Sequence, residues 1–335
     1  MKKTLLAVLV IVVAMTFLAA PRKKEKSKPH ALNWPVQDSV IEDTPPVNIP
    51  TFEDARKLIT VDKNKEFLYW FADDAREGRM SGKKGNREAA EFIKKKFELF
   101  GLQTSYQKFP IRRMNPGPNN ETGDDFSQNV IGILPGKTNR VITITSHVDH
   151  VGYGPQMTLD NKVGIHNGAD DNGSGCTGVV ALAEAFSKAP KLEHTLVFIT
   201  FSGEEMGLVG SKYYVKSLSK EKVQEIDLMI NFDMIGRLSN NTCQAIGARK
   251  NPKLMEVFGK LQDQHRITFE PSTGDNDNGS DHAPFRDAGV PFCFFFTGMH
   301  KDYHRVSDKP DTINYEGLTN IVRFAFDVVA SYDKK

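Results

Sequence analysis

The stretch 141–149 reads VITITSHVD, in which a β-branched and apolar run leads directly into His147 and Asp149. Two later runs have the same form and are also followed by carboxylate residues. These are residues 195–201 before Glu204 and Glu205, and residues 226–232 before Asp233. Nearly continuous apolar runs of this length are typical of central parallel strands that are covered on both faces.

The segments between and around these runs have helical or strand patterns. Helices are expected at 173–188 and 207–218, so the order is strand, helix, strand, helix, strand. The remaining expected elements are a helical pattern over 51–79, helices at 87–100, 253–265 and 315–332, and strands at 102–111, 127–134 and 290–297. We therefore predict an α/β fold, a three-layer sandwich with a central mixed, mostly parallel sheet covered by helices on both faces.

Composition excludes several classes of protein. With 335 residues, 39% of them hydrophobic and 26% charged, the chain is neither disordered nor a multi-span membrane protein. The net charge is +2, and no basic stripe with interleaved aromatic residues suggests a nucleic-acid partner. Three distant cysteines, Cys176, Cys243 and Cys293, are interpreted as buried thiols with at most one bridge.

The N-terminus has the pattern of an export signal. Lys2 and Lys3 precede an apolar run at 5–20 that is short for a membrane-spanning helix. We expect an exported protein, periplasmic or secreted, unless an uncleaved signal anchor holds it at the membrane. The basic stretch 22–28 is a solvated linker or, alternatively, a tether to anionic headgroups. The predicted organisation is a signal peptide or anchor at 1–20, a linker at 21–50 and one domain at 51–335.

Ligands of parallel α/β sheets bind beyond the carboxyl ends of the strands, where His147, the two glutamates and Asp233 fall. Adjacent carboxylates such as Glu204 and Glu205 repel each other, and the pair makes sense if one binds metal and the other acts as a base. Asp170 and Asp171 in a glycine-rich turn, and His304 in a late loop, add further ligands. Together these residues predict a paired zinc site whose two ions share one carboxylate.

Each motif alone has a structural explanation, because a single His-x-Asp is usually structural and paired aspartates suit a turn near a helix N-terminus. The combination is what favours metal. Four further histidines fall near the site in sequence and could contact substrate or support the ligands. They are His150, His166, His282 and His300.

The motifs together resemble the co-catalytic di-zinc aminopeptidases, peptidase family M28 of metallopeptidase clan MH. The resemblance covers roughly residues 55–332, including the upstream Glu77-Gly78-Arg79. The motifs that carry it are SHVD at 146–149, GADDNGSG at 168–175, SGEEMGL at 202–208, NFDMIG at 231–236, SDH at 280–282, and Tyr303-His304 followed by Asp308.

The resemblance implies a role for each site residue. Asp170 would bridge two Zn²⁺ ions, His147 and Asp233 would complete one ion, and Glu205 and His304 would complete the other. Glu204 would be the general base, and Asp149 would orient the His147 ring. A cis peptide is expected between the two aspartates.

The implied activity is that of a zinc aminopeptidase, a metallopeptidase and hydrolase acting on peptides with a free N-terminus, with an apolar first residue mildly favoured. Glutaminyl cyclase is the nearest alternative, although its relatives typically have Asp-Ser where this chain has Asp170-Asp171. A non-catalytic ectodomain of the same fold would be expected to lose ligands. A carboxypeptidase acting on acidic peptides would need a cationic pocket that the sequence does not locate. The segment 152–167 fits no pattern.

Overall fold

The computed structural model describes residues 51–112 and 124–334. The predicted export signal at 1–20 and the linker at 21–50 lie outside these residues, so both stay predictions. Within the described ranges, no helix has the length and apolar character needed to cross a membrane.

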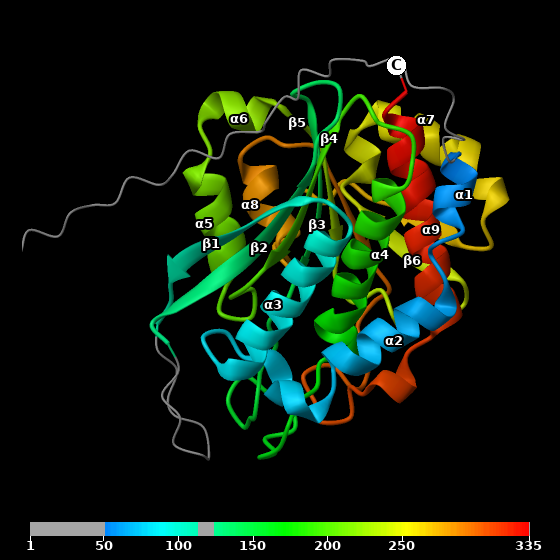
Figure 1. Cartoon of the computed structure of the whole chain (residues 1–335). Coiled ribbons are helices and arrows are strands. Elements are labelled where there is room, and N and C mark those ends of the chain that lie inside the picture. Colours follow the sequence, from blue (N-terminus) through cyan, green and yellow to red (C-terminus); the bar gives the residue numbers. More distant parts are fainter. Residues whose placement is uncertain (1–50, 113–123, 335) are drawn as a thin grey trace, which may run out of the picture. The chain divides into compact units, whose positions relative to one another are not determined.

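One mixed sheet organises the described residues (Figure 1). Its strand order is β1-β2-β4-β3-β5-β8-β6-β7, and the central neighbours β4, β3, β5 and β8 run parallel. Antiparallel pairs flank this centre, at β1–β2, β2–β4 and β6–β8. The strands are β1 (Gln103–Pro110), β2 (Phe126–Leu134), β3 (Val141–His147), β4 (Thr195–Phe201), β5 (Ile226–Phe232), β6 (Thr242–Ile246), β7 (Thr268–Pro271) and β8 (Phe292–Phe296).

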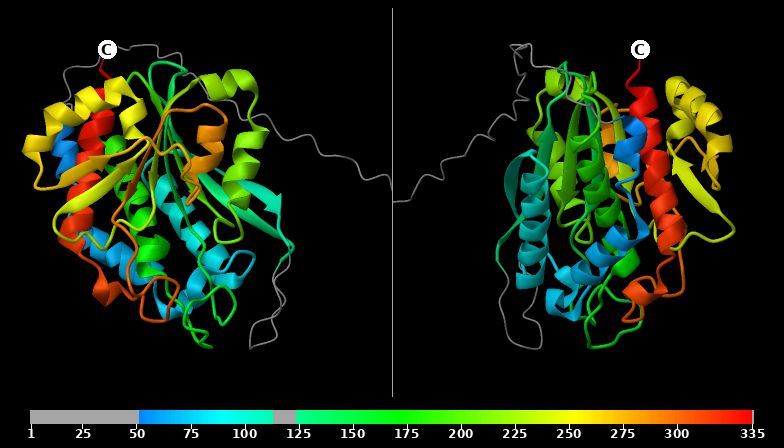
Figure 2. Two further views of the ribbon diagram at one scale, coloured as in Figure 1. Left: turned by 180° about the vertical axis from the view of Figure 1, so that it is seen from behind. Right: turned by 45° about the vertical axis from the view of Figure 1, so that its right-hand side comes forward.

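Helices cover both faces of the sheet, as two views of the ribbon make clear (Figure 2). The larger layer contains α1 (Phe52–Arg56), α2 (Val61–Phe71), α3 (Lys84–Leu99), α4 (Gly175–Ser187), α7 (Pro252–Leu261) and α9 (Tyr315–Tyr332). The opposite face carries α5 (Val209–Ser217), α6 (Lys220–Gln224) and α8 (His282–Asp287). The predicted fold class is therefore confirmed.

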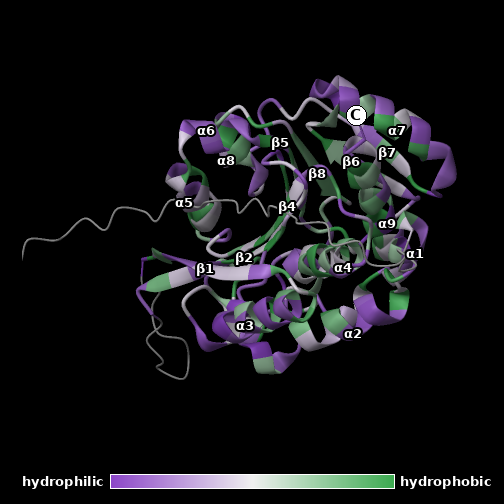
Figure 3. Ribbon diagram, turned by 45° about the horizontal axis from the view of Figure 1, so that its top comes forward, coloured by the Kyte–Doolittle hydropathy of each residue, from purple (hydrophilic) through white to green (hydrophobic). Residues whose placement is uncertain are grey.

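Two apolar cores lie between these layers. The larger core packs α4 and α9 against the sheet, and most side chains of α9 are buried in it. The smaller core lies under α5 and α8, where Tyr214 and Phe285 stack with ring centroids 5.9 Å apart. Hydrophilic and hydrophobic segments alternate along the helices in Figure 3, as expected for helices that have one face on the sheet. The three cysteines are all buried and free, so no bridge forms.

The observed elements differ from the predicted ones mainly at the edges. The helical pattern at 51–79 is broken into α1 and α2, because Thr60 is extended and caps α2 through Lys63 N–H. Helix α3 begins at Lys84, three residues earlier than predicted, and includes Gly85. A Cβ on Gly85 would lie 1.8 Å from the Arg76 carbonyl oxygen, so the close approach requires glycine. The elements β6, β7, α6 and α8 were not predicted.

Candidate metal centre

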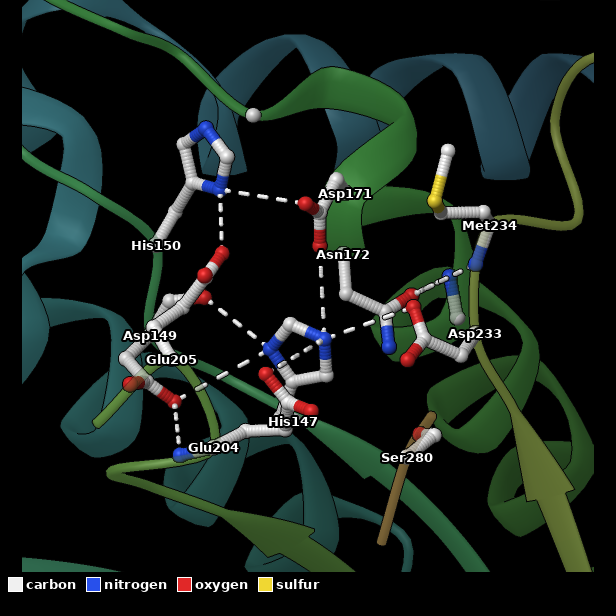
Figure 4. Close-up of polar contacts among 12 residues, drawn as sticks. His147, Asp149, His150, Asp171, Asn172, Glu204, Glu205, Asp233, Met234 and Ser280 are labelled. Atoms are coloured by element: carbon white, nitrogen blue, oxygen red, sulfur yellow. Dashed lines mark hydrogen bonds and ion pairs between the residues drawn. The ribbon is translucent and has the colours of Figure 1, made fainter. Parts of the chain in front are cut away.

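The carboxyl ends of β3, β4 and β5 meet at one edge of the sheet and bring the ligand-type residues together (Figure 4). His147 is the last residue of β3, Glu204 and Glu205 lie in the turn after β4, and Asp233 follows β5. Asp171 enters from the turn Ala169–Ser174 that precedes α4. The buried parallel strands thus fix the positions of the residues at their carboxyl ends.

A first group of ligand atoms comes from His147, Asp171 and Asp233, which are all buried. The Nε2 atom of His147 lies 3.3 Å from Asp171 Oδ1 and 3.3 Å from Asp233 Oδ1. Its Nδ1 atom is 3.2 Å from the main-chain oxygen of Asp149, which fixes Nδ1 as the protonated nitrogen. Nε2 is therefore the atom free to bind a cation. Glu204 Oε2 lies just beyond, 3.9 Å from it.

A second group consists of His150, Asp171, Glu205 and His304. His304 Nε2 lies 3.1 Å from Asp171 Oδ2 and 3.0 Å from Glu205 Oε2. The other ring nitrogen of His304 donates to the main-chain oxygen of Met157 at 2.8 Å, which again directs Nε2 into the site. His150 Nδ1 is 2.9 Å from Glu205 Oε1 and 3.6 Å from Asp171 Oδ2.

The two groups share Asp171, one carboxylate oxygen facing each (Figure 4). Carboxylates of Asp171, Glu204, Glu205 and Asp233 crowd into a space where none of these side chains is more than 13% exposed. Buried carboxylates without a compensating positive charge destabilise a folded protein. A bound cation would remove this cost, and zinc binds imidazole and carboxylate ligands. The residues present fit a pair of divalent cations.

The structure contradicts the prediction that Asp170 lies between the two groups. Asp170 is buried but points away: its Oδ1 accepts the Gly236 N–H at 2.6 Å, and its Oδ2 lies 3.1 Å from His300 Nε2. Adjacent residues in a tight turn point their side chains in different directions. Asp171, and not Asp170, therefore lies between the two ligand groups. The cis peptide is likewise at Asp171–Asn172 and not between the two aspartates.

Comparison with known proteins identifies the family of this chain. Residues 129–329 match the sequence profile of peptidase family M28. The chain belongs to peptidase family M28. The predicted resemblance is thereby confirmed.

Named relatives share the M28 segment but are longer. The chain is 32% identical over 232 residues to leupeptin-inactivating enzyme 1 of Streptomyces exfoliatus, covering 68% of this chain and 46% of that protein. It is 28% identical over 202 residues to aminopeptidase YwaD of Bacillus subtilis, covering 57% and 42%. The chain spans about half the length of the curated relatives it matches.

Solved structures show the same M28 fold. A zinc aminopeptidase from Bacillus subtilis superposes with a TM-score of 0.70 at 17% identity, over 83% of this chain and 96% of that one. A glutaminyl cyclase from Fimbriiglobus ruber superposes with a TM-score of 0.67 at 19% identity, over 82% and 96%. At these low identities the superpositions establish the fold only, and the reaction must be inferred from the residues of the site.

Asp149 does not belong to either ligand group of this M28 chain. Its Oδ2 accepts from Ser81 Oγ at 3.0 Å, and its Oδ1 accepts the Glu204 N–H at 3.3 Å and lies 3.8 Å from His147 Nδ1. Burial raises the pKa of Asp149 to about 6. Asp149 thus touches the backbone of one site residue and the ring of another, which suits a positioning role.

Two residues contribute to the candidate metal centre in ways that the sequence does not predict, His150 and Arg79. The sequence does not separate His150 from the three other nearby histidines. His150 lies beyond the end of β3, so the alternation of the strand no longer predicts where its side chain points. Arg79 is buried and donates to the main-chain oxygens of Val148, Asn167 and Gly168 at 3.0, 2.6 and 2.8 Å. One guanidinium therefore joins the segments that carry His147 and Asp171. The motif at 77–79 does not indicate this role of Arg79, because the three main-chain acceptors of its guanidinium lie about 70–90 residues further along the chain.

The other two histidines near the site in sequence have different partners. His166 Nε2 lies 3.1 Å from Asp160 Oδ1, within the 152–167 segment that fitted no pattern. His282 stacks on Phe292 and Phe294 of β8, with ring centroids 4.9 and 4.7 Å apart. Neither belongs to a ligand group.

Proposed function

We propose that residues 51–335 form a single catalytic domain, a two-zinc aminopeptidase that removes the first residue of peptides. The carrying observation is that two ligand groups share the Asp171 carboxylate with Glu204 beside them. His147 and Asp233 would complete one zinc site, and Glu205 and His304 the other. His150 would hold Glu205 through the 2.9 Å contact. When bound, two zinc ions supply Lewis acidity and make water a nucleophile near neutral pH.

Glu204 is the residue suited to move the proton. It belongs to neither ligand group, and burial raises the pKa of its carboxyl well above the ordinary value, against the opposing effect of nearby His147. A base with raised pKa accepts a proton from the attacking water more readily. The same carboxyl then returns that proton to the leaving amine as the peptide bond breaks.

A cavity of about 310 Å³ opens beside the first ligand group. His147, Asp171, Glu204 and Asp233 line one part of it. No lysine or arginine is among the described residues that line this cavity, so it lacks the cationic group that a terminal carboxylate would need, which favours aminopeptidase over carboxypeptidase action. The cavity also holds several apolar side chains, which can contact the side chain of the first residue.

Glutaminyl cyclase remains the second candidate, because one solved structure of this fold has that name. The doubled aspartate does not distinguish the two enzymes, because the shared carboxylate is that of Asp171 and the residue after it is Asn172. The presence of a second ligand group does distinguish them, because a cyclase that acts at one zinc needs only one such group. Retention of every ligand also argues against a non-catalytic ectodomain.

A panel of amino-acid 4-nitroanilides, each with an N-acetylated counterpart, tests the proposal. We expect turnover of the free-amine compounds alone, loss of activity with 1,10-phenanthroline, and recovery on adding zinc, because chelation removes the Lewis acid. An N-terminal glutamine peptide serves as the control for cyclisation. Turnover of acetylated substrates, ring closure without hydrolysis, or full activity in metal-free protein would reject the assignment.

A further inference from the structure

Beside the metal centre, the substrate cavity has a second part with a different chemistry. Its walls are largely apolar and come from β6, β8 and the segments that follow β5 and β8. The apolar side chains are Met234, Ile246, Phe294, Phe296 and Met299. Two polar side chains interrupt these walls, Gln244 of β6 and Asp277 of the loop before α8. Such a lining suits a long side chain with an apolar stem and a polar end.

The strand register explains how the walls are built. Gln244 pairs with Phe296 and Ile246 with Phe294 across the antiparallel β6–β8 ladder. Because alternate residues of a strand face the same side, these four side chains share one face of the sheet. Asp277 belongs to the loop over that face, since His282 stacks on Phe294 at 4.7 Å and its Nε2 atom lies 3.5 Å from Asp277 Oδ1.

Within the part of the chain that the structure describes, the Asp277 carboxylate has one basic side chain in ion-pair range, that of His282. Among the described residues, no lysine or arginine forms an ion pair with it. Arg286 is nearby, but its guanidinium contacts the main-chain oxygen of Asp277 and pairs with the Asp287 carboxylate. His282 is buried, and burial lowers its pKa to about 4, so this ring is neutral near pH 7.

We propose that this cavity selects peptides whose first residue is basic, lysine above all, with Asp277 receiving the side-chain ammonium group. The inference rests on the proposed aminopeptidase function and narrows its substrate. Zinc would compensate the carboxylates of the metal centre, whereas the charge on Asp277 would remain to attract a cation. The apolar walls would contact the four-carbon stem, and the Gln244 amide oxygen offers a second acceptor for the ammonium group.

Lysine and norleucine 4-nitroanilides isolate the charge, because both have a four-carbon stem and only lysine carries the ammonium group. The Asp277 side chain is 28% exposed, so solvent weakens the interaction. We expect kcat/KM for lysine to exceed that for norleucine by about three- to tenfold. Added salt should reduce this ratio, since screening acts on a partly exposed pair.

The Asp277→Asn variant should bring the lysine-to-norleucine ratio close to one. Asparagine can still accept the Gly279 N–H that Asp277 Oδ1 accepts at 2.8 Å, so the loop should keep its turn. Asp275→Asn is the matched control, because Asp275 lies in the same loop, pairs with Lys250 and is outside the cavity lining. This control should keep the wild-type ratio.

The possible failures are distinguishable. A wild-type enzyme that cleaves both compounds with a ratio at or below one overturns the basic preference and leaves the aminopeptidase function intact. An equal loss with both compounds in Asp277→Asn also overturns it, because Asp277 would then serve a group common to all substrates. A wild-type enzyme that cleaves neither compound, nor any other free-amine anilide, contradicts the proposed function itself.

Discussion

The Glu204→Gln variant should bind two zinc ions per chain yet lose at least about a hundredfold in kcat. Removing a positioned general base typically costs two to four orders of magnitude. KM should change little, because Glu204 lies outside both ligand groups. Steady-state kinetics on a free-amine anilide, together with metal analysis of the same preparation, measures both quantities.

Glu205→Gln is the matched control, since it makes the same chemical change one residue away. Glu205 belongs to the second ligand group, 3.0 Å from His304 Nε2, so its variant should lose or weaken one metal. Part of its activity should return as added zinc refills the site. If instead Glu204→Gln loses metal and Glu205→Gln keeps two, the roles of the glutamates are exchanged.

Asp171→Asn should lower zinc content below one ion per chain. The two oxygens of Asp171 face different ligand groups, and a neutral amide offers only one oxygen to two cations. Zinc content measured by mass spectrometry after dialysis against a weak chelator checks this expectation. Activity should fall with the metal.

Asp170→Asn is the control that separates the adjacent aspartates. Asp170 accepts the Gly236 N–H, lies beside His300 and belongs to neither ligand group, so its variant should keep two zinc ions. It should still lower the free energy of unfolding, by about 1–3 kcal/mol, because an amide nitrogen would face the protonated nitrogen of His300 in a buried site. Loss of both metals in Asp170→Asn with retention in Asp171→Asn would restore the role first predicted from the sequence.

The sequence predicts the centre of the fold well, because its strands are long, β-branched and buried on both faces. The runs 195–201 and 226–232 coincide with β4 and β5, and β3 extends one residue beyond the run 141–146, to His147. Strand β6 escapes prediction because it is only five residues long and two of these residues, Thr242 and Gln244, are polar. Strand β7 has only four residues and pairs in parallel with a segment distant in sequence.

Ligand residues at strand ends are predictable for the same reason. Once β3 and β5 are located, the positions of His147 and Asp233 follow from the sheet. The turn that carries Asp170 and Asp171 has no such regularity: Asp171 and Asn172 have non-helical backbone angles within it. Two chemically identical neighbours in an irregular turn cannot be ranked without coordinates, which is why the sequence alone favours Asp170 for the position between the two groups that Asp171 occupies.

Crystals grown with zinc and measured on both sides of the zinc absorption edge test the central claim most directly. Two anomalous peaks about 3.5–4 Å apart are expected, one beside His147 and Asp233 and the other beside Glu205 and His304, with Asp171 between them. A single peak, or two peaks that do not share the Asp171 carboxylate, would contradict the two-zinc account.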